Sequence, residues 1–342
     1  YPVVVHSVWS MNGFLSPHIV DPLWGTGMID FAGSGVVHVT GGVTAFLAAF
    51  ILGPRKGRFY DESGATIENP KKIQGHSVSL QVLGTFILWF GWYGFNAGSA
   101  LQISSKTNAA LASRAAVSTT LGAASGTIVA LFVSAVIAER RTGETLFDIT
   151  NALNGCLAGL VSITAGCALI EPWAAVIIGG IAGAIYLAFS TFIVRIKIDD
   201  SVDAIPVHFA NGIWGVVAVG LFAVPEYLQD AYGRSDHVGW FYSFSRGSSD
   251  ATLLGANLVG LLFILGWVIG IMTPFFLLLN YIGWFRADAL EEIVGLDISY
   301  HGGPAYVADD SYAENMTHAF EVAKSKMDEE SEEEENQKEG IA

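Results

Sequence analysis

The chain is poor in charged residues, which make up only 14% of its 342 residues. A soluble domain carries about 25% charged residues. Much of the acidic charge lies in one run, residues 328–335, so the formal net charge of −15 describes a solvated tail more than a binding surface. No basic patch is available to hold phosphate, which disfavours a nucleic-acid partner.

Cysteine is also scarce. The two cysteines, Cys156 and Cys167, lie in or at the edge of one apolar stretch. They are too few for a disulfide framework and do not have the spacing of metal ligands. We therefore interpret them as small buried residues, and we expect no metal ion and no cofactor.

Apolar residues, by contrast, are abundant: hydrophobic residues make up 52% of the chain, and the mean hydropathy is +0.47. Seven apolar runs have the length of about 20 residues that a membrane-spanning helix needs. Two of these runs carry glycine pairs at the small-xxx-small spacing of packed membrane helices, Gly122 with Gly126 and Gly155 with Gly159. The sequence thus predicts an all-α polytopic membrane protein. The seven runs are residues 31–53, 78–100, 115–138, 149–170, 174–195, 205–224 and 253–283.

The basic residues predict the orientation of these spans. Seven spans place the two ends of the chain on opposite sides, and the loops on the side of the C-terminus carry thirteen lysines and arginines against four on the other side. The positive-inside rule then places Tyr1 outside and the tail in the cytoplasm. We expect an extracellular vestibule segment at 1–30, a transmembrane domain at 31–283 and a cytoplasmic regulatory and acidic tail at 284–342.

Two of the eight histidines, His38 and His208, lie inside predicted spans. Ionisable residues there are costly and are functional candidates by default. Both occur in the pattern Val-His-x-x-x-Gly, and each also follows an aspartate, Asp30 or Asp203, at the start of its span. This match predicts an inverted repeat of five helices per half, with the site where the halves meet.

Paired neutral imidazoles would suit a small solute that can both donate and accept hydrogen bonds. Two other interpretations stay open. The histidines could hold neighbouring helices together, or they could ligate a haem.

Several segments resemble the ammonium transporter family (Amt/Mep, related to the Rhesus glycoproteins), over a total range of residues 1–306. The resemblance implies a plasma-membrane transporter of ammonium or ammonia, not an enzyme. It also implies eleven helices in two inverted five-helix halves and a homotrimer with one pore per subunit. About seven of the eleven helices would be present here, the fifth to the eleventh, so we expect four more before Tyr1 and no transport by residues 1–342 alone. The resembling segments are 30–42, 83–99, 154–168, 208–215 and 295–306.

The resemblance also implies roles for individual residues. The twin histidines would line a pore that conducts ammonia, after ammonium has been recruited on an aromatic face by cation–π attraction and then deprotonated. The resemblance assigns His38 and His208 to the pore and proton relay, Trp9 and Ser99 to the outer ammonium site, Phe95 to the gate, Trp92 to the pore lining, Asp30 to the outer vestibule and Ser299 to regulation in the tail.

The chain departs from the family pattern after His208, where Phe209 and Ala210 stand in place of a small glycine. We therefore expect a different local pore width. Transport, a sensor that signals through its tail, and a haem redox protein are the three competing functions. Within transport, the sequence does not separate electrogenic from neutral conduction.

Overall fold

The computed structural model describes residues 1–61, 63–73, 75–301 and 325. These residues form helices and no strand, apart from one isolated bridge between Tyr60 and Thr66. The chain divides into two compact units. The first comprises Tyr1–Gly53 and Ser77–Leu277, and the second comprises Pro54–His76 and the residues from Leu278 onward.

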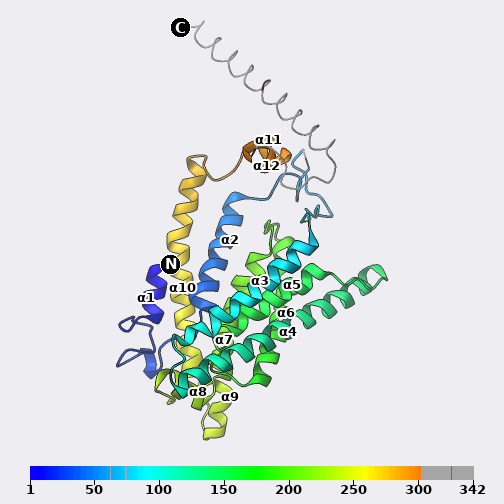
Figure 1. Ribbon diagram of the computed structural model, residues 1–342. Coiled ribbons are helices and arrows are strands. Elements are labelled where there is room, and N and C mark those ends of the chain that lie inside the picture. Colours follow the sequence, from blue (N-terminus) through cyan, green and yellow to red (C-terminus); the bar gives the residue numbers. More distant parts are fainter. Residues whose placement is uncertain (62, 74, 302–324, 326–342) are drawn as a thin grey trace, which may run out of the picture. The chain divides into compact units, whose positions relative to one another are not determined.

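Six helices of the described residues are long and apolar enough to cross a membrane, and each matches a predicted span. The predicted fold class, an all-α polytopic membrane protein, is therefore confirmed. Two of the six begin as π-helices, η2 (Ser34–Val39) before α2 (Thr40–Leu52) and η4 (Ile205–Ala210) before α7 (Asn211–Phe222). The remaining four contain α3 (Val78–Asn96) with η3 (Gly98–Ala100), α4 (Lys106–Thr142), α6 (Pro172–Arg195) and α10 (Thr252–Tyr281) (Figure 1).

The seventh predicted span, 149–170, is a shorter apolar helix, α5 (Ile149–Ile163). The helix ends after Ile163, where the Ser34 hydroxyl donates to the Val161 carbonyl and accepts the Ala165 N–H in place of the next helical bond. The residues that follow bond the segment before η2. The carbonyls of Thr164 and Ala165 accept hydrogen bonds from the N–H groups of Ala32 and Phe31. These two hydrogen bonds join the segment after α5 to the segment before the first span.

Helix α4 is longer than the predicted 115–138. Its 37 residues extend over about 55 Å, well beyond a hydrocarbon layer of about 30 Å. The Ser105 side chain caps its start and Gly143, at φ 79°, ends it. Hydropathy found only the apolar middle of this helix.

Helices α4, α5 and α6 pack through the predicted glycine pairs. A Cβ placed on Gly159 would lie 2.2 Å from the carbonyl oxygen of Gly122, and one on Gly126 would lie 2.4 Å from that of Gly155. Only glycine allows the backbones of α4 and α5 to approach this closely. The small-xxx-small prediction is confirmed.

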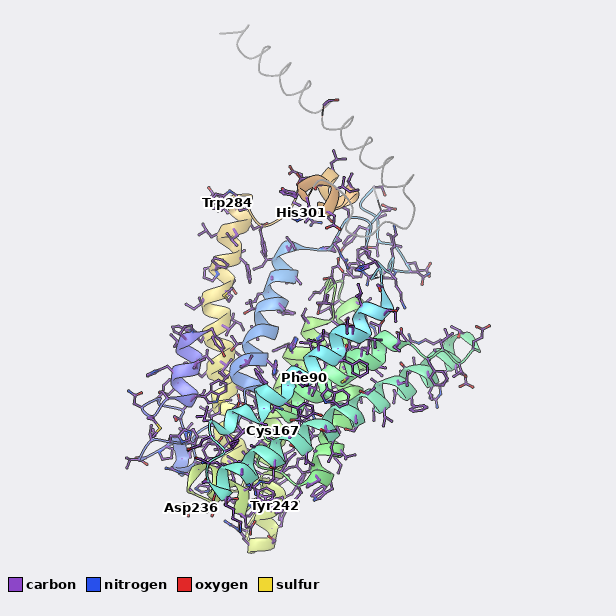
Figure 2. All side chains as sticks on the ribbon, in the orientation of Figure 1. Phe90, Cys167, Asp236, Tyr242, Trp284 and His301 are labelled. Carbon is purple, nitrogen blue, oxygen red and sulfur yellow. The ribbon has the colours of Figure 1, made fainter. Side chains whose placement is uncertain are left out.

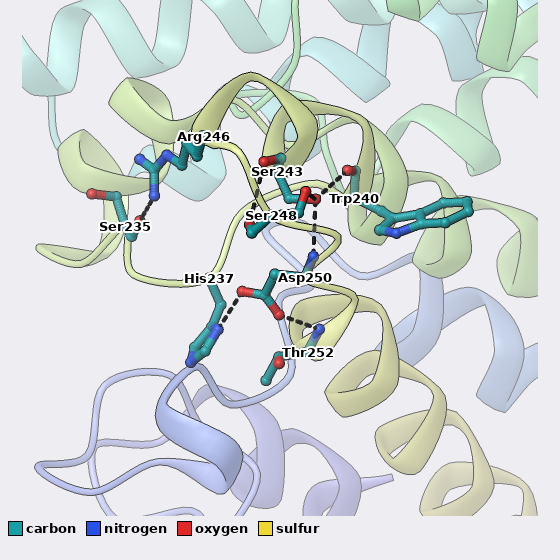
Figure 3. A network of polar contacts seen from close by, with 8 residues as sticks. All are labelled: Ser235, His237, Trp240, Ser243, Arg246, Ser248, Asp250 and Thr252. Carbon is teal, nitrogen blue, oxygen red and sulfur yellow. Dashed lines mark hydrogen bonds and ion pairs between the residues drawn. The ribbon is translucent and has the colours of Figure 1, made fainter.

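A polar network closes the loop before α10, after the short helices α8 (Pro225–Tyr232) and α9 (Trp240–Ser243) (Figure 3). The Asp250 carboxylate lies 2.7 Å from Nδ1 of His237 and accepts a 2.9 Å hydrogen bond from the N–H of Thr252. Burial alone would raise the pKa of Asp250, but the hydrogen bonds from Thr252 and His237 outweigh it and lower the pKa to about 2. Asp250 therefore acts as an ionised cap of α10.

The second unit contains two short helices, α11 (Ala289–Val294) and α12 (Leu296–His301). Arg286 ties them to residues 54–76: its guanidinium bonds both carboxylate oxygens of Glu292 at 2.9 Å and the Pro54 carbonyl at 2.8 Å. The predicted acidic run, 328–335, lies outside the described residues, as does most of the predicted tail.

Candidate functional site

The two intramembrane histidines lie side by side, one from each predicted half. His38 comes from η2 and is only 7% exposed, and the half-buried His208 comes from η4. Their ring centroids are 5.2 Å apart and the ring planes differ by 15°. Two residues that are 170 positions apart in the sequence thus form one site.

Matching carboxylates hold the two histidine segments. Asp30, eight residues before His38, accepts backbone N–H groups of Gly33, Gly35 and Val36 at 2.8–3.0 Å. Asp200, eight residues before His208, accepts those of Ala204 and Ile205. Each carboxylate thus satisfies donors that the first turn of a helix leaves free. Burial raises the pKa of Asp30, while the N–H groups of Val36, Gly35 and Gly33 oppose that rise.

The choice of Asp203 as the counterpart of Asp30 is wrong. Asp203 accepts hydrogen bonds from the hydroxyls of Tyr186 and Ser190 at 2.9 and 3.0 Å instead of capping η4. Asp203, at φ 56°, corresponds to Gly33, at φ 111°, because each follows its capping aspartate by three residues in the left-handed region. The equal spacing of eight residues to each histidine was the signal in the sequence that identifies Asp200.

The glycines of the Val-His-x-x-x-Gly pattern lie where the two halves cross. A Cβ on Gly42 would lie 2.3 Å from the backbone nitrogen of Phe209, the residue after His208. A Cβ on Gly212 would lie 2.9 Å from Cγ2 of Val39, the residue after His38. The contact is thus reciprocal, and it explains why both histidines are followed by glycine at the same distance.

Aromatic side chains of α3 cover His38. Trp92 lies nearly parallel to it, with centroids 5.2 Å apart, and Phe95 lies 5.6 Å from both rings. The indole N–H of Trp92 donates to the Thr164 hydroxyl at 3.1 Å, which fixes the ring. Trp92 is buried, whereas Phe95 is 36% exposed.

Each histidine has a buried nitrogen without a hydrogen-bond partner among the described residues, Nε2 of His38 and Nδ1 of His208. Such atoms are costly in a protein interior and call for a partner. A bis-histidine haem does not provide it, because the porphyrin would have to lie between two rings whose centroids are only 5.2 Å apart. A small solute with hydrogen-bonding groups fits better.

The other predicted site residues, Trp9, Ser99 and Ser299, each make separate contacts. The indole N–H of Trp9, in α1 (Pro2–Trp9), donates to the backbone carbonyl of Asp30 at 2.7 Å. The Ser99 hydroxyl donates to the Phe95 carbonyl at 2.8 Å. Within the described ranges, no hydrogen bond or ring contact joins Trp9 to Ser99. Ser299 lies in α12 of the second unit, where its hydroxyl donates to the Gly295 carbonyl.

Two buried polar residues that support the site, Ser34 and Asn257, were not predicted from the sequence. Ser34 donates to the Val161 carbonyl and accepts from the Ala165 N–H, both at 2.8 Å. Asn257 of α10 pairs with both backbone groups of Ile29. An uncharged polar residue within an apolar run is too common a feature to have singled them out.

Comparison with known proteins gives the family of this chain. A family model described as Ammonium Transporter Family matches residues 1–306. The chain belongs to this family. It is 42% identical over 320 residues to the Solanum lycopersicum protein named Ammonium transporter 1 member 3, covering 90% of this chain and 66% of that protein.

Solved structures of the ammonium transporter family have the same fold. One named Sensor Amt Protein superimposes with a TM-score of 0.68 at 32% identity, covering 88% of this chain and 66% of the other. Mep2 of Saccharomyces cerevisiae gives a TM-score of 0.64 at 30% identity, covering 76% and 54%. The chain spans 66% and 62% of the first two curated relatives, both named as transporters rather than enzymes.

Proposed function

We propose that the protein conducts ammonium or ammonia across a membrane through a pore that passes His38 and His208. The observation that carries the proposal is the pair of buried, unpartnered nitrogens on adjacent imidazoles. One neutral imidazole can donate and the other can accept, so together they suit ammonia, which has N–H groups and a lone pair. The names of the relatives support the same solute.

Recruitment of ammonium is assigned to Trp9, Phe95, Trp92 and Ser99. An aromatic face attracts the ion by about 0.5–2 kcal/mol, depending on its desolvation. The Ser99 hydroxyl donates its hydrogen bond to the Phe95 carbonyl. The Ser99 oxygen can then accept a hydrogen bond from an N–H of the ion. Potassium has no hydrogen to donate, so this contact favours ammonium.

Ammonium would lose its proton beside Phe95 before passage through the pore, and this proton would return to the outer solution or be relayed separately from the ammonia. Moving the intact ion through a low-dielectric pore would cost several kcal/mol even after relaxation, whereas neutral ammonia avoids that cost. We assign the carboxylate of Asp30 a positioning role, because it accepts the backbone N–H groups of Gly33, Gly35 and Val36 where η2 begins. Phe209, which packs against Phe46 and Phe189, makes the wall below His208 bulkier than glycine would.

The assembly and orientation follow the family. We infer a homotrimer in the plasma membrane with the C-terminus in the cytoplasm. Exposed large apolar side chains of α3 support a surface that faces lipid or another subunit, since Phe86 is 64% exposed and Phe90 is 79% exposed. Phe90 is labelled in Figure 2. Ser299 is proposed as a regulatory position.

The test is the current evoked by ammonium in a voltage-clamped cell that expresses the full-length protein, with and without His208→Ala. We expect the substitution to change the size or the ion selectivity of the current. Unchanged current and selectivity would refute the role of the histidine pair. Absence of any ammonium current or uptake by the unsubstituted protein would refute conduction itself.

A sensor is the second candidate, since one similar structure is named Sensor Amt Protein. A sensor would bind ammonium at the same aromatic group and signal through its tail without flux. Binding without uptake, together with a signal that is lost on truncation after residue 284, would favour it over the transporter.

A further inference from the structure

A polar cavity of ≈ 330 Å³ lies in the second unit, directly after the last turn of α10. Its size is at the lower end of the range for small-molecule pockets. Three charged side chains line it, Lys56, Arg286 and Asp288, together with the amide of Asn280. Because Arg286 is paired with Glu292, one cation and one anion are left, and this pair is suited to a zwitterion.

The two charges are not neutralised by each other or by other described residues. The ammonium of Lys56 has no ion-pair partner there, while the backbone N–H of the same residue is held by Glu292 at 2.6 Å. The third charged wall residue, Arg286, is already paired with Glu292 at 2.9 Å. Asp288 caps α11 with its carboxylate, which accepts the N–H of Glu291 and retains free lone pairs.

The position of the cavity points to a lipid. Helix α10 is a membrane span, and two residues at its end are highly exposed: Tyr281 at 88% and Trp284 at 81%. Trp284 is labelled in Figure 2. Exposed tyrosine and tryptophan at the end of a span are typical of the membrane interface, at the depth of the head groups. Leu278 and Ile282, on the same turn, offer exposed apolar surface for an acyl chain.

We propose that this cavity binds the head group of an ethanolamine phospholipid. The phosphate lies at Lys56 and Asn280, and the primary ammonium lies at Asp288. A lysine is a compact point charge that suits a phosphate, and a primary ammonium donates hydrogen bonds to a carboxylate. Choline cannot make that second contact, and the carboxylate repels a purely anionic head group. The charge bias of the loops places this site in the cytoplasmic leaflet, and the proposal does not depend on ammonium conduction.

Short-chain phospholipids test the proposal on the full-length protein in mild detergent, with the shift of the thermal unfolding midpoint as the measure of binding. The ethanolamine lipid is expected to bind about tenfold more tightly than the choline or glycerol lipid. Phosphoethanolamine without acyl chains is expected to bind at least about tenfold more weakly than the lipid. Equal affinity for all three lipids, or for phosphoethanolamine and the lipid, would overturn the assignment.

Three variants locate the site. Lys56→Gln is expected to weaken binding of the ethanolamine lipid about tenfold. Asp288→Asn keeps a good helix cap and is expected to abolish the preference for ethanolamine over choline. Lys71→Gln, an exposed lysine of the same unit that does not line the cavity, is the matched control and is expected to bind normally. Normal binding by Lys56→Gln, or an equal loss in Lys71→Gln, would contradict the proposal.

Discussion

Asp30 and Asp200 hold equivalent places in the two halves of the protein. Each carboxylate stands eight residues before an intramembrane histidine and bonds the free N–H groups where a π-helical segment begins. The equivalence extends to the residue three positions after each aspartate, Gly33 or Asp203, which is in the left-handed region. It also includes the glycine four positions after each histidine, Gly42 or Gly212. The same local arrangement thus occurs twice, once before each of the two adjacent imidazoles.

The two capping aspartates should differ in how much stability they provide. Asp30 is 1% exposed and accepts three backbone hydrogen bonds, whereas Asp200 is half-buried and accepts two. At about 1.5–3 kcal/mol for a hydrogen bond to a charged group, Asp30→Ala should lower the free energy of unfolding by more than Asp200→Ala. Denaturation in detergent measures both. An equal loss of unfolding free energy in the two variants, or a larger loss in Asp200→Ala, would show that the burial of the aspartate does not govern its contribution to stability.

Ammonium conduction should depend on the glycine at the crossing of the halves. Gly42→Ala places a methyl group 2.3 Å from the Phe209 backbone nitrogen, and overpacking of this kind costs about 1–3 kcal/mol. We expect a lower unfolding midpoint and a reduced ammonium current. Gly41→Ala is the matched control, because a Cβ there meets nothing within 4 Å. Equal behaviour of the two variants would contradict the close crossing.

Ser99→Ala should weaken ammonium binding without unfolding the protein. The substitution removes the oxygen that accepts an N–H of the ion, which at about 1 kcal/mol corresponds to roughly a fivefold higher half-saturating concentration. Ser99→Thr retains the hydroxyl and should bind nearly as well. Concentration dependence of the ammonium current measures the effect, and an unchanged half-saturation in Ser99→Ala would remove Ser99 from the site.

The Asp250 cap should give a pH-dependent contribution to stability. The folded pKa of about 2 lies below the ordinary value of about 3.9. The contribution is therefore fully present above about pH 4 and is lost as the pH falls through about 2, with a size of roughly 1–2 kcal/mol. Asp250→Asn should be less stable at pH 7, and the difference should shrink as the pH falls below about 4 and vanish only at about pH 1, below both pKa values. A pH-independent difference would show that charge is not the cause.

Predictions from the sequence were accurate where one property of the local sequence governs the structure. Hydropathy located the spans because a membrane helix must be apolar over about 20 residues, and glycine spacing found the α4–α5 contact because only small residues permit it. Hydropathy predicted too long a helix at 149–170. The helix ends at Ile163 because residues 161–165 form hydrogen bonds with Phe31, Ala32 and Ser34, which are distant in the sequence. Asp203 was chosen over Asp200 because composition near a helix start does not reveal which carboxylate faces the free N–H groups.

The sequence by itself determined the membrane character of the chain, its spans, its family and the two histidines that stand apart from the rest. The tertiary structure decided the contacts between distant segments: the 5.2 Å separation of the two histidine rings, the cover of His38 by Trp92, and the cavity beside Lys56. It also decided which carboxylates, Asp30 and Asp200, cap the two histidine segments. Hydropathy and glycine spacing act within one helix, whereas the ring contacts and the cavity join segments more than 50 residues apart and depend on how the helices pack.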